Sequence, residues 1–107
     1  MSLQYTITCS AMNDRDVAVI KSLLGIIGKV GGADWSYSDD PGADVVIVDV
    51  EEGGVGSLKA HKNKRALVVY ASPDKTLIPN TFMLNKPARA RDLIDVLTAI
   101  QNRLVAG

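Results

Sequence analysis

Three polar residues stand at or just beyond the ends of apolar segments. Asp49 ends the run Val45-Val46-Ile47-Val48, Ser72 comes shortly after the segment 66–70, and Lys86 follows the segment 81–84. Ligand-binding and catalytic groups collect at the carboxyl ends of parallel strands. A carboxylate and an ammonium group at one such edge are expected to pair, because a half-buried charge needs a partner. The sequence therefore predicts a strand-end site that contains an Asp49–Lys86 ion pair.

Five segments have the composition of β-strands, being rich in β-branched and aliphatic residues and bounded by turn-forming residues. In 45–48 and 66–70 the apolar residues do not alternate with polar ones, which is typical of parallel strands buried on both faces. The segment 33–38 has a weaker signal. The expected strands are 5–9, 33–38, 45–48, 66–70 and 81–84.

Two further segments have the spacing of helices with one buried face. The first begins after a cap at Asn13 or Asp14 and ends at Gly28. The second covers about residues 89–104, and the segment 57–62 could add one or two helical turns. The apolar stripes consist of Val17, Ile20, Leu24 and Ile27 in the first helix, and of Leu93, Val96, Leu97, Ile100 and Leu104 in the second.

This alternation of strands with helices or loops predicts an α/β domain with a mainly parallel sheet flanked by helices. The chain has 107 residues, a typical size for one domain. We therefore expect residues 1–107 to form a single domain, and to be one part of a longer multidomain protein. The short segments between Gly28 and Val45, and between Tyr70 and Lys86, leave little room for full helices.

Composition and charge argue against several classes of partner. The 12 basic and 12 acidic residues cancel, so no long-range field draws the domain to nucleic acid or to an anionic membrane. The basic run from Lys59 to Arg65 contains no aromatic residue, so we expect a solvated face. The single cysteine, Cys9, excludes an internal disulfide, and no apolar run is long enough to span a bilayer. We expect a cytoplasmic protein with neither a nucleic-acid nor a membrane partner.

Over almost its whole length the chain resembles the receiver domains of two-component response regulators. Asp44-Val45-Val46-Ile47-Val48-Asp49-Val50 is similar to the third strand of that family, which ends in the phosphoacceptor aspartate. Phe82-Met83-Leu84-Asn85-Lys86-Pro87 is similar to the fifth strand with its lysine and proline. The resemblance implies a flavodoxin-like three-layer sandwich around a five-stranded parallel sheet, here with shortened second, third and fourth helices. It gives Asp49 the phosphoacceptor position and Lys86 the position of the family's lysine.

This sequence departs most clearly from the family's pattern at the metal site. Working receivers hold Mg²⁺ with two acids directly after the first strand, and Ala11 and Met12 occupy those positions here. Neither side chain can ligate Mg²⁺, which requires oxygen ligands. Asp14 and Asp16 lie nearby, at the cap and in the first turn of the following helix.

Other positions also depart from the pattern. The family's small hydroxyl residue corresponds to Tyr70 or, with a shifted alignment, to Ala71 or Ser72. Met83 stands at the position of the switch aromatic, and Glu51-Glu52-Gly53-Gly54 replaces the usual loop after the phosphoacceptor. We expect these loop glutamates to be solvated. Together the departures indicate a degenerate receiver.

The sequence therefore predicts a pseudo-receiver, which is not an enzyme, has no cofactor and acts through protein–protein interaction. The expected partner is another protein, an output domain or a second copy in a homodimer. It would bind to the last helix, which carries the apolar Ile94 beside Arg89, Arg91, Asp92, Asp95 and Arg103.

Two alternatives remain open. One is a divergent but active response-regulator receiver, phosphorylated at Asp49 in a phosphorelay with Mg²⁺ as its cofactor. The other is a small-molecule binding domain that uses the cleft at the strand ends, although no loop specifies a ligand.

Overall fold

Strands and helices alternate along the chain, as the residue pattern predicts. The computed structural model describes residues 3–30, 33–40, 42–53, 66–72, 81–86 and 88–106. The helices are α1 (Asp14–Ile27), α2 (Val50–Gly53) and α3 (Ala90–Ala106). The strands are β1 (Leu3–Ser10), β2 (Lys29–Val30), β3 (Ala33–Tyr37), β4 (Val45–Asp49), β5 (Ala66–Ala71) and β6 (Phe82–Asn85).

All described strands belong to one sheet, in the order β2-β3-β1-β4-β5-β6. Five neighbouring strands of this sheet, β3, β1, β4, β5 and β6, pair in parallel. This confirms the predicted α/β class and its five-stranded parallel sheet. Strand β2 is an addition, since Lys29 and Val30 pair antiparallel with Asp34 and Ala33. No sequence pattern indicates β2, because two residues are too few to show a period.

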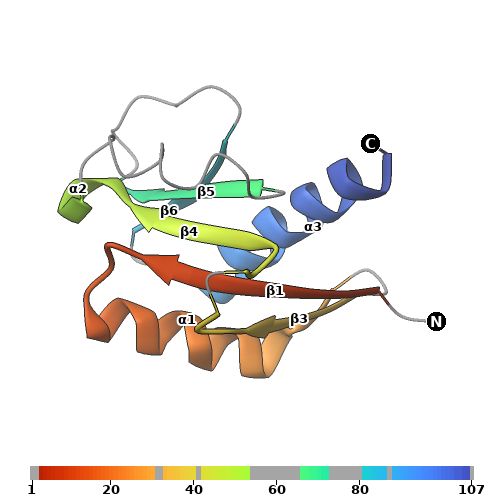
Figure 1. The fold of residues 1–107 in the computed structure, drawn as a ribbon, viewed down its shortest axis with the longest axis horizontal. Coiled ribbons are helices and arrows are strands. Elements are labelled where there is room, and N and C mark those ends of the chain that lie inside the picture. The colour runs from red at the N-terminus through yellow and green to blue at the C-terminus, as the bar shows by residue number, and fades with distance from the viewer. Residues whose placement is uncertain are drawn as a thin grey trace.

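Helices α1 and α3 pack on the same face of the sheet and share its larger core. Figure 1 shows α1 lying along that face, and the arrowheads of β1, β4 and β5 pointing to the edge where α2 lies. On the opposite face a smaller cluster is buried, with Val50 of α2 packed against it. All five residues of β4 are buried, as expected for a central strand. The smaller cluster consists of Val46, Val48, Val69 and Ala71.

The crossover from β3 to β4 has no helix in its described residues, 38–40 and 42–44. The prediction of a shortened second helix between these strands is therefore wrong. The reason is a stagger around β1: β3 ends level with Ile7, and β4 begins level with the same residue. In the usual parallel crossover the chain must run back along the length of a strand, and a helix commonly spans that distance. Here the chain only has to cross over β1, so a short loop is enough.

Thr6 on β1 holds this short crossover in place. The backbone N–H of Thr6 donates to Asp44 Oδ2 at 3.0 Å, and Asp44 N–H donates back to Thr6 Oγ1 at 3.2 Å. Ser38 N–H donates to the Ile7 carbonyl at 2.8 Å. The Thr6 hydroxyl therefore has its hydrogen-bond partner in the crossover segment itself.

Helix α2 has four residues and begins directly after β4, where the sequence predicts a loop; the shortened third helix is predicted further along the chain. The helical turns expected at 57–62 and the expected fourth helix lie outside the described residues. No described helix has both the length and the apolar character needed to cross a membrane.

Helix α1 ends where it meets β3, at Gly28. Its carbonyl accepts a hydrogen bond from Trp35 N–H at 2.6 Å. A Cβ atom at Gly28 would lie 2.5 Å from the Leu24 carbonyl oxygen and 2.6 Å from that of Trp35. Both obstacles are backbone atoms, so neither can move aside without shifting the helix or the strand. At Gly25, in the same helix, a Cβ would meet nothing within 4 Å.

The same substitution at these two glycines should therefore change stability in opposite directions. We expect Gly28→Ala to lower the free energy of unfolding by about 1–3 kcal/mol, as overpacking typically does. Gly25→Ala should raise it by about 0.5–1 kcal/mol, because alanine favours the helix more than glycine does. Urea denaturation of both variants measures the difference, and equal effects at the two sites would contradict the packing of α1 on β3.

Candidate functional site

Asp49 and Lys86 form the ion pair that the sequence predicts. Asp49 is the last residue of β4, and its side chain is 0% exposed. Lys86 directly follows β6. Its Nζ lies 2.9 Å from Asp49 Oδ1 and 2.8 Å from Oδ2. One ammonium group therefore holds both oxygens of a buried carboxylate, the arrangement that such a charge needs.

The ammonium reaches Asp49 by crossing β5. In the sheet register, Asp49 lies beside Tyr70, and Tyr70 lies beside Leu84. Adjacent strands are about 4.8 Å apart, so Lys86 has to span roughly two such spacings. It passes near the Tyr70 ring, with Nζ 5.2 Å from the ring centroid. At its base, Lys86 N–H donates to the Ala71 carbonyl at 2.9 Å, which anchors the residue to β5.

Glu51 and Ser72 complete what we call the strand-end cluster, consisting of Asp49, Glu51, Ser72 and Lys86. Glu51 Oε1 accepts from Ser72 N–H at 2.9 Å and from Ser72 Oγ at 3.0 Å, and it lies 3.4 Å from Lys86 Nζ. Glu51 N–H donates to Asp49 Oδ1 at 3.0 Å. Glu51 is exposed, as predicted, but its carboxylate also makes these specific contacts within the cluster. Its exposed carboxylate closes the cluster because α2 begins immediately after Asp49.

The two outer charges shift each other's ionisation. Partial burial lowers the pKa of Lys86, but the hydrogen bond and charge of Asp49, together with Glu51, outweigh it and leave that pKa above its usual value. The hydrogen bonds from the Ser72 hydroxyl and backbone N–H lower the pKa of Glu51, and Lys86 lowers it further. At neutral pH Glu51 is therefore a carboxylate beside an ammonium group.

The residues near this edge do not fit the magnesium site that the receiver resemblance implies. Ala11 is exposed with φ 57°, and Met12 is partly buried against the core. Asp16 bonds to Asn13 through its backbone N–H and its carboxylate. Within the described chain, no three acidic, histidine or cysteine side chains come together as a metal site would require. The Lys86 ammonium instead contacts both oxygens of the Asp49 carboxylate.

Most of the other residues discussed in the sequence pack in or against the apolar core. Burial raises the pKa of the Cys9 thiol to about 12, so Cys9 is a protonated core residue at neutral pH. Tyr70 is buried, and its hydroxyl oxygen accepts from Ala88 N–H at 3.2 Å. Of the three positions considered for the family's hydroxyl, Ser72 is the one whose hydroxyl enters the cluster. Met83 packs against the smaller apolar cluster, while the Lys59–Arg65 run and Pro87 lie outside the described residues.

Removing the Lys86 cation should lower the free energy of unfolding more than removing the Asp49 anion. In Lys86→Met the Asp49 charge stays buried without its partner, and we expect a loss of about 3–5 kcal/mol in the free energy of unfolding. Asp49→Asn leaves a lysine whose side chain is 23% exposed and can be hydrated, so the loss should be smaller. The double variant should lose less than the sum of the two, because no charge is stranded. Additive losses in urea denaturation would show that the pair does not stabilise the fold.

Comparison with known proteins identifies no relative. No family model, curated protein or solved structure matches the chain. The resemblance to receiver domains therefore rests on the residues quoted for it, and the function has to be argued from the geometry.

Proposed function

We propose that this domain is a pseudo-receiver: a cytoplasmic, flavodoxin-like signalling module that binds protein partners and does not transfer phosphoryl groups. The order β3-β1-β4-β5-β6 of its parallel strands supports the fold assignment, since flavodoxin-like sheets are ordered 2-1-3-4-5. Asp49 and Lys86 lie at the carboxyl ends of the two strands that the resemblance names.

The state of Asp49 is the observation that carries the proposal. A carboxylate acts as a nucleophile only if one oxygen can approach the electrophile in line. Both Asp49 oxygens contact Lys86 Nζ within 3 Å, and the side chain has no exposed surface. The neighbouring Glu51 carboxylate adds a negative charge that repels a phosphoryl donor. These contacts favour a structural ion pair over a phosphoacceptor.

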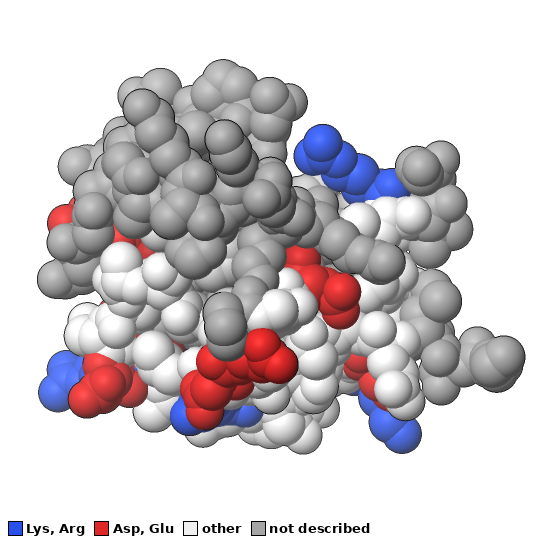
Figure 2. Space-filling view, in the orientation of Figure 1, with Lys and Arg blue, Asp and Glu red and all other residues white. Residues whose placement is uncertain are grey.

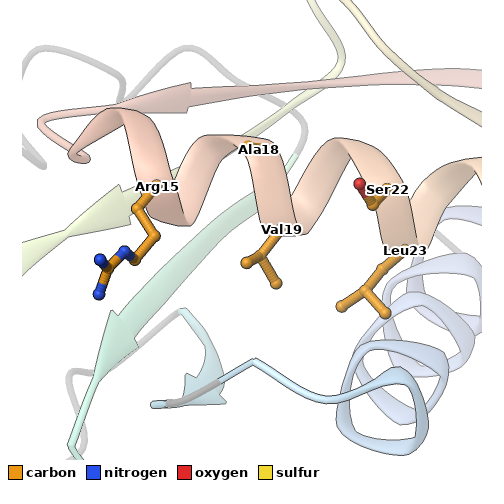
Figure 3. Close-up of a pocket in the computed structure, with 5 residues that line it drawn as sticks. All are labelled: Arg15, Ala18, Val19, Ser22 and Leu23. Atoms are coloured by element: carbon orange, nitrogen blue, oxygen red, sulfur yellow. The ribbon is translucent and has the colours of Figure 1, made fainter.

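Exposed apolar side chains on the two long helices support the protein-binding part of the proposal. Among the described residues, the large hydrophobic side chains with substantial exposure are Val19 (37%) and Ile26 (79%) on α1, and Ile94 (37%) on α3. Val19 also lines a shallow hollow along α1, where Arg15, Val19 and Leu23 extend to the same side of the helix (Figure 3). The lining residues are Arg15, Ala18, Val19, Ser22 and Leu23.

The charges around Ile94 suit a second copy of this chain as partner. Arg91 and Asp95 are exposed one helical turn apart on α3, so two antiparallel α3 helices could pair them reciprocally, as a two-fold interface requires. Over the described part of the face in Figure 2, acidic and basic side chains are interspersed and form no continuous basic patch. This mixture favours a protein partner over a polyanion.

Phosphotransfer is tested by treating the domain with a small-molecule phosphodonor and Mg²⁺. We expect the intact mass of the wild type to stay unchanged, because Lys86 and Glu51 surround the Asp49 carboxylate. Asp49→Asn, treated in the same way, controls for phosphorylation at other residues. A gain of one phosphoryl group that disappears in Asp49→Asn would overturn the proposal and establish the active-receiver alternative.

Self-association tests the proposed surface. We expect analytical ultracentrifugation to show an average mass that rises with wild-type concentration and does not rise for Ile94→Asp. Ala99→Asp, at an exposed position about 140° around α3 from Ile94, serves as the matched control for added charge. Neither substitution should unfold the domain, because neither position belongs to the buried core. A wild type that stays monomeric at all concentrations would exclude the homodimer.

A further inference from the structure

A groove runs between α1 and α3, and a cation–π contact marks the outer flank of each helix. Helix α1 packs on β3, and α3 packs on β6 at the other end of the sheet. Lys21 of α1 lies over the Tyr37 ring of β3, with Nζ 4.6 Å from the ring centroid. Arg103 of α3 lies over the Phe82 ring of β6 at 5.7 Å. The opposite flanks of the two helices therefore face each other.

Exposed apolar side chains occupy these facing flanks. Successive residues of a helix are about 100° apart, so Val19 lies about 160° around α1 from Lys21, and Ile94 lies about 180° around α3 from Arg103. Both side chains are 37% exposed. Figure 3 shows Val19 and Leu23 extending to the side of α1 on which α3 lies. The exposed apolar surfaces of the two helices therefore meet at the groove.

Helix α3 by itself is too small to hold a second copy of the chain. An interface of standard size uses about 20–30 residues on each side, whereas α3 has 17 residues and buries one face against the sheet. Its neighbour on the same face is α1, which carries Val19 and Ile26, the other exposed large hydrophobic side chains among the described residues. A second copy that covers Ile94 therefore has to cover part of α1.

The position of the two-fold axis on α3 also determines its position on α1. Reciprocal pairs of Arg91 and Asp95 between antiparallel α3 helices place the axis level with Leu93, three residues after the start of α3. Both helices follow the carboxyl end of a strand, β1 or β6, and run back along the sheet from that edge. The corresponding level on α1 is three to four residues after its start, between Val17 and Ala18.

The charges of α1 are reciprocal about that level. Asp14 and Lys21 are both exposed, and they lie on the same flank of α1 because they are seven residues, or about two turns, apart. Each is equally far from the axis. An antiparallel copy would therefore place Asp14 of one chain beside Lys21 of the other, twice in each dimer. Charged residues beside the contact line of paired helices make such pairs in coiled coils.

The apolar side chains gather at the centre of the same arrangement. Val19 and Ile94 lie within two residues of the level of the axis, so each would approach its own symmetry mate. Together they would form an apolar centre inside a rim of charged pairs, which is the usual organisation of a protein interface. The hollow along α1 lies at this level, and its small side chains, Ala18 and Ser22, let two α1 helices come close.

We propose that a second copy of this chain docks on α1 as well as on α3, through two reciprocal Asp14–Lys21 pairs around an apolar centre of Val19 and Ile94. The inference rests on the proposed function, because it specifies the homodimer expected there. It adds α1 to the docking surface and makes the two α1 helices antiparallel.

Exchanging the charges of α1 tests the proposal by analytical ultracentrifugation. Lys21→Glu and Asp14→Lys each bring like charges together at two symmetry-related places, and we expect each to raise the dimer dissociation constant by at least about fivefold. The double variant has opposite charges again, with their positions exchanged, and its dissociation constant should return close to that of wild type. Such a return separates the pair from the loss of the Lys21–Tyr37 contact, which the double variant also lacks.

Two further variants delimit the surface. Lys29→Glu reverses an exposed charge on β2, beyond the end of α1, and should leave the dissociation constant unchanged. Val19→Asp places a charge in the apolar centre and should prevent association, as Ile94→Asp should on α3.

The proposal is overturned if Lys21→Glu weakens association no more than Lys29→Glu does, if the double variant does not recover, or if the wild type is monomeric at all concentrations. Association that depends on Ile94 and not on Val19 would retain the homodimer of the proposed function and remove α1 from it. A phosphoryl group gained at Asp49 would overturn the proposed function without changing any of these outcomes.

Discussion

The buried charge of Asp49 is the constraint on which the strand-end edge depends. A carboxylate with no exposed surface has to be paired, because an unpaired charge would cost several kcal/mol in this environment. Its partner comes from β6, two strands away, so β5 and β6 must be in register for Lys86 to reach across Tyr70. The ion pair thereby links three neighbouring strands at one point and determines which groups meet there.

That pairing also decides what chemistry remains. With both Asp49 oxygens on Lys86, the buried carboxylate acts as an anchor for the ammonium. The outward side of the ammonium faces Glu51, and Ser72 adds two further donors. The solvent-accessible part of the cluster is therefore its outer layer of Glu51, Ser72 and Lys86. A nucleophilic role for Asp49 would require the inner layer to open.

Much of this could be predicted from particular residues. Local or periodic patterns in the sequence are enough to predict three features. These are the β-branched strand before Asp49, the apolar stripes of α1 and α3, and Asn13 as the cap of α1. The Asp49–Lys86 pair followed from the rule that parallel strands end at one edge. Strand β2, the helix-free crossover and the part of Glu51 in the cluster were missed. Each depends on how distant segments are staggered, which no local pattern records.

The sequence by itself determined the class of the fold, the parallel sheet and the two residues that meet at its edge, because periodicity and strand-end polarity are properties of the chain. The tertiary structure decided the rest. The stagger of β3 and β4 along β1 removed the need for a crossover helix, and the immediate turn of α2 after Asp49 brought Glu51 back onto Ser72 and Lys86. These outcomes depend on distances between segments far apart in the sequence, and such distances exist only once the sheet has formed.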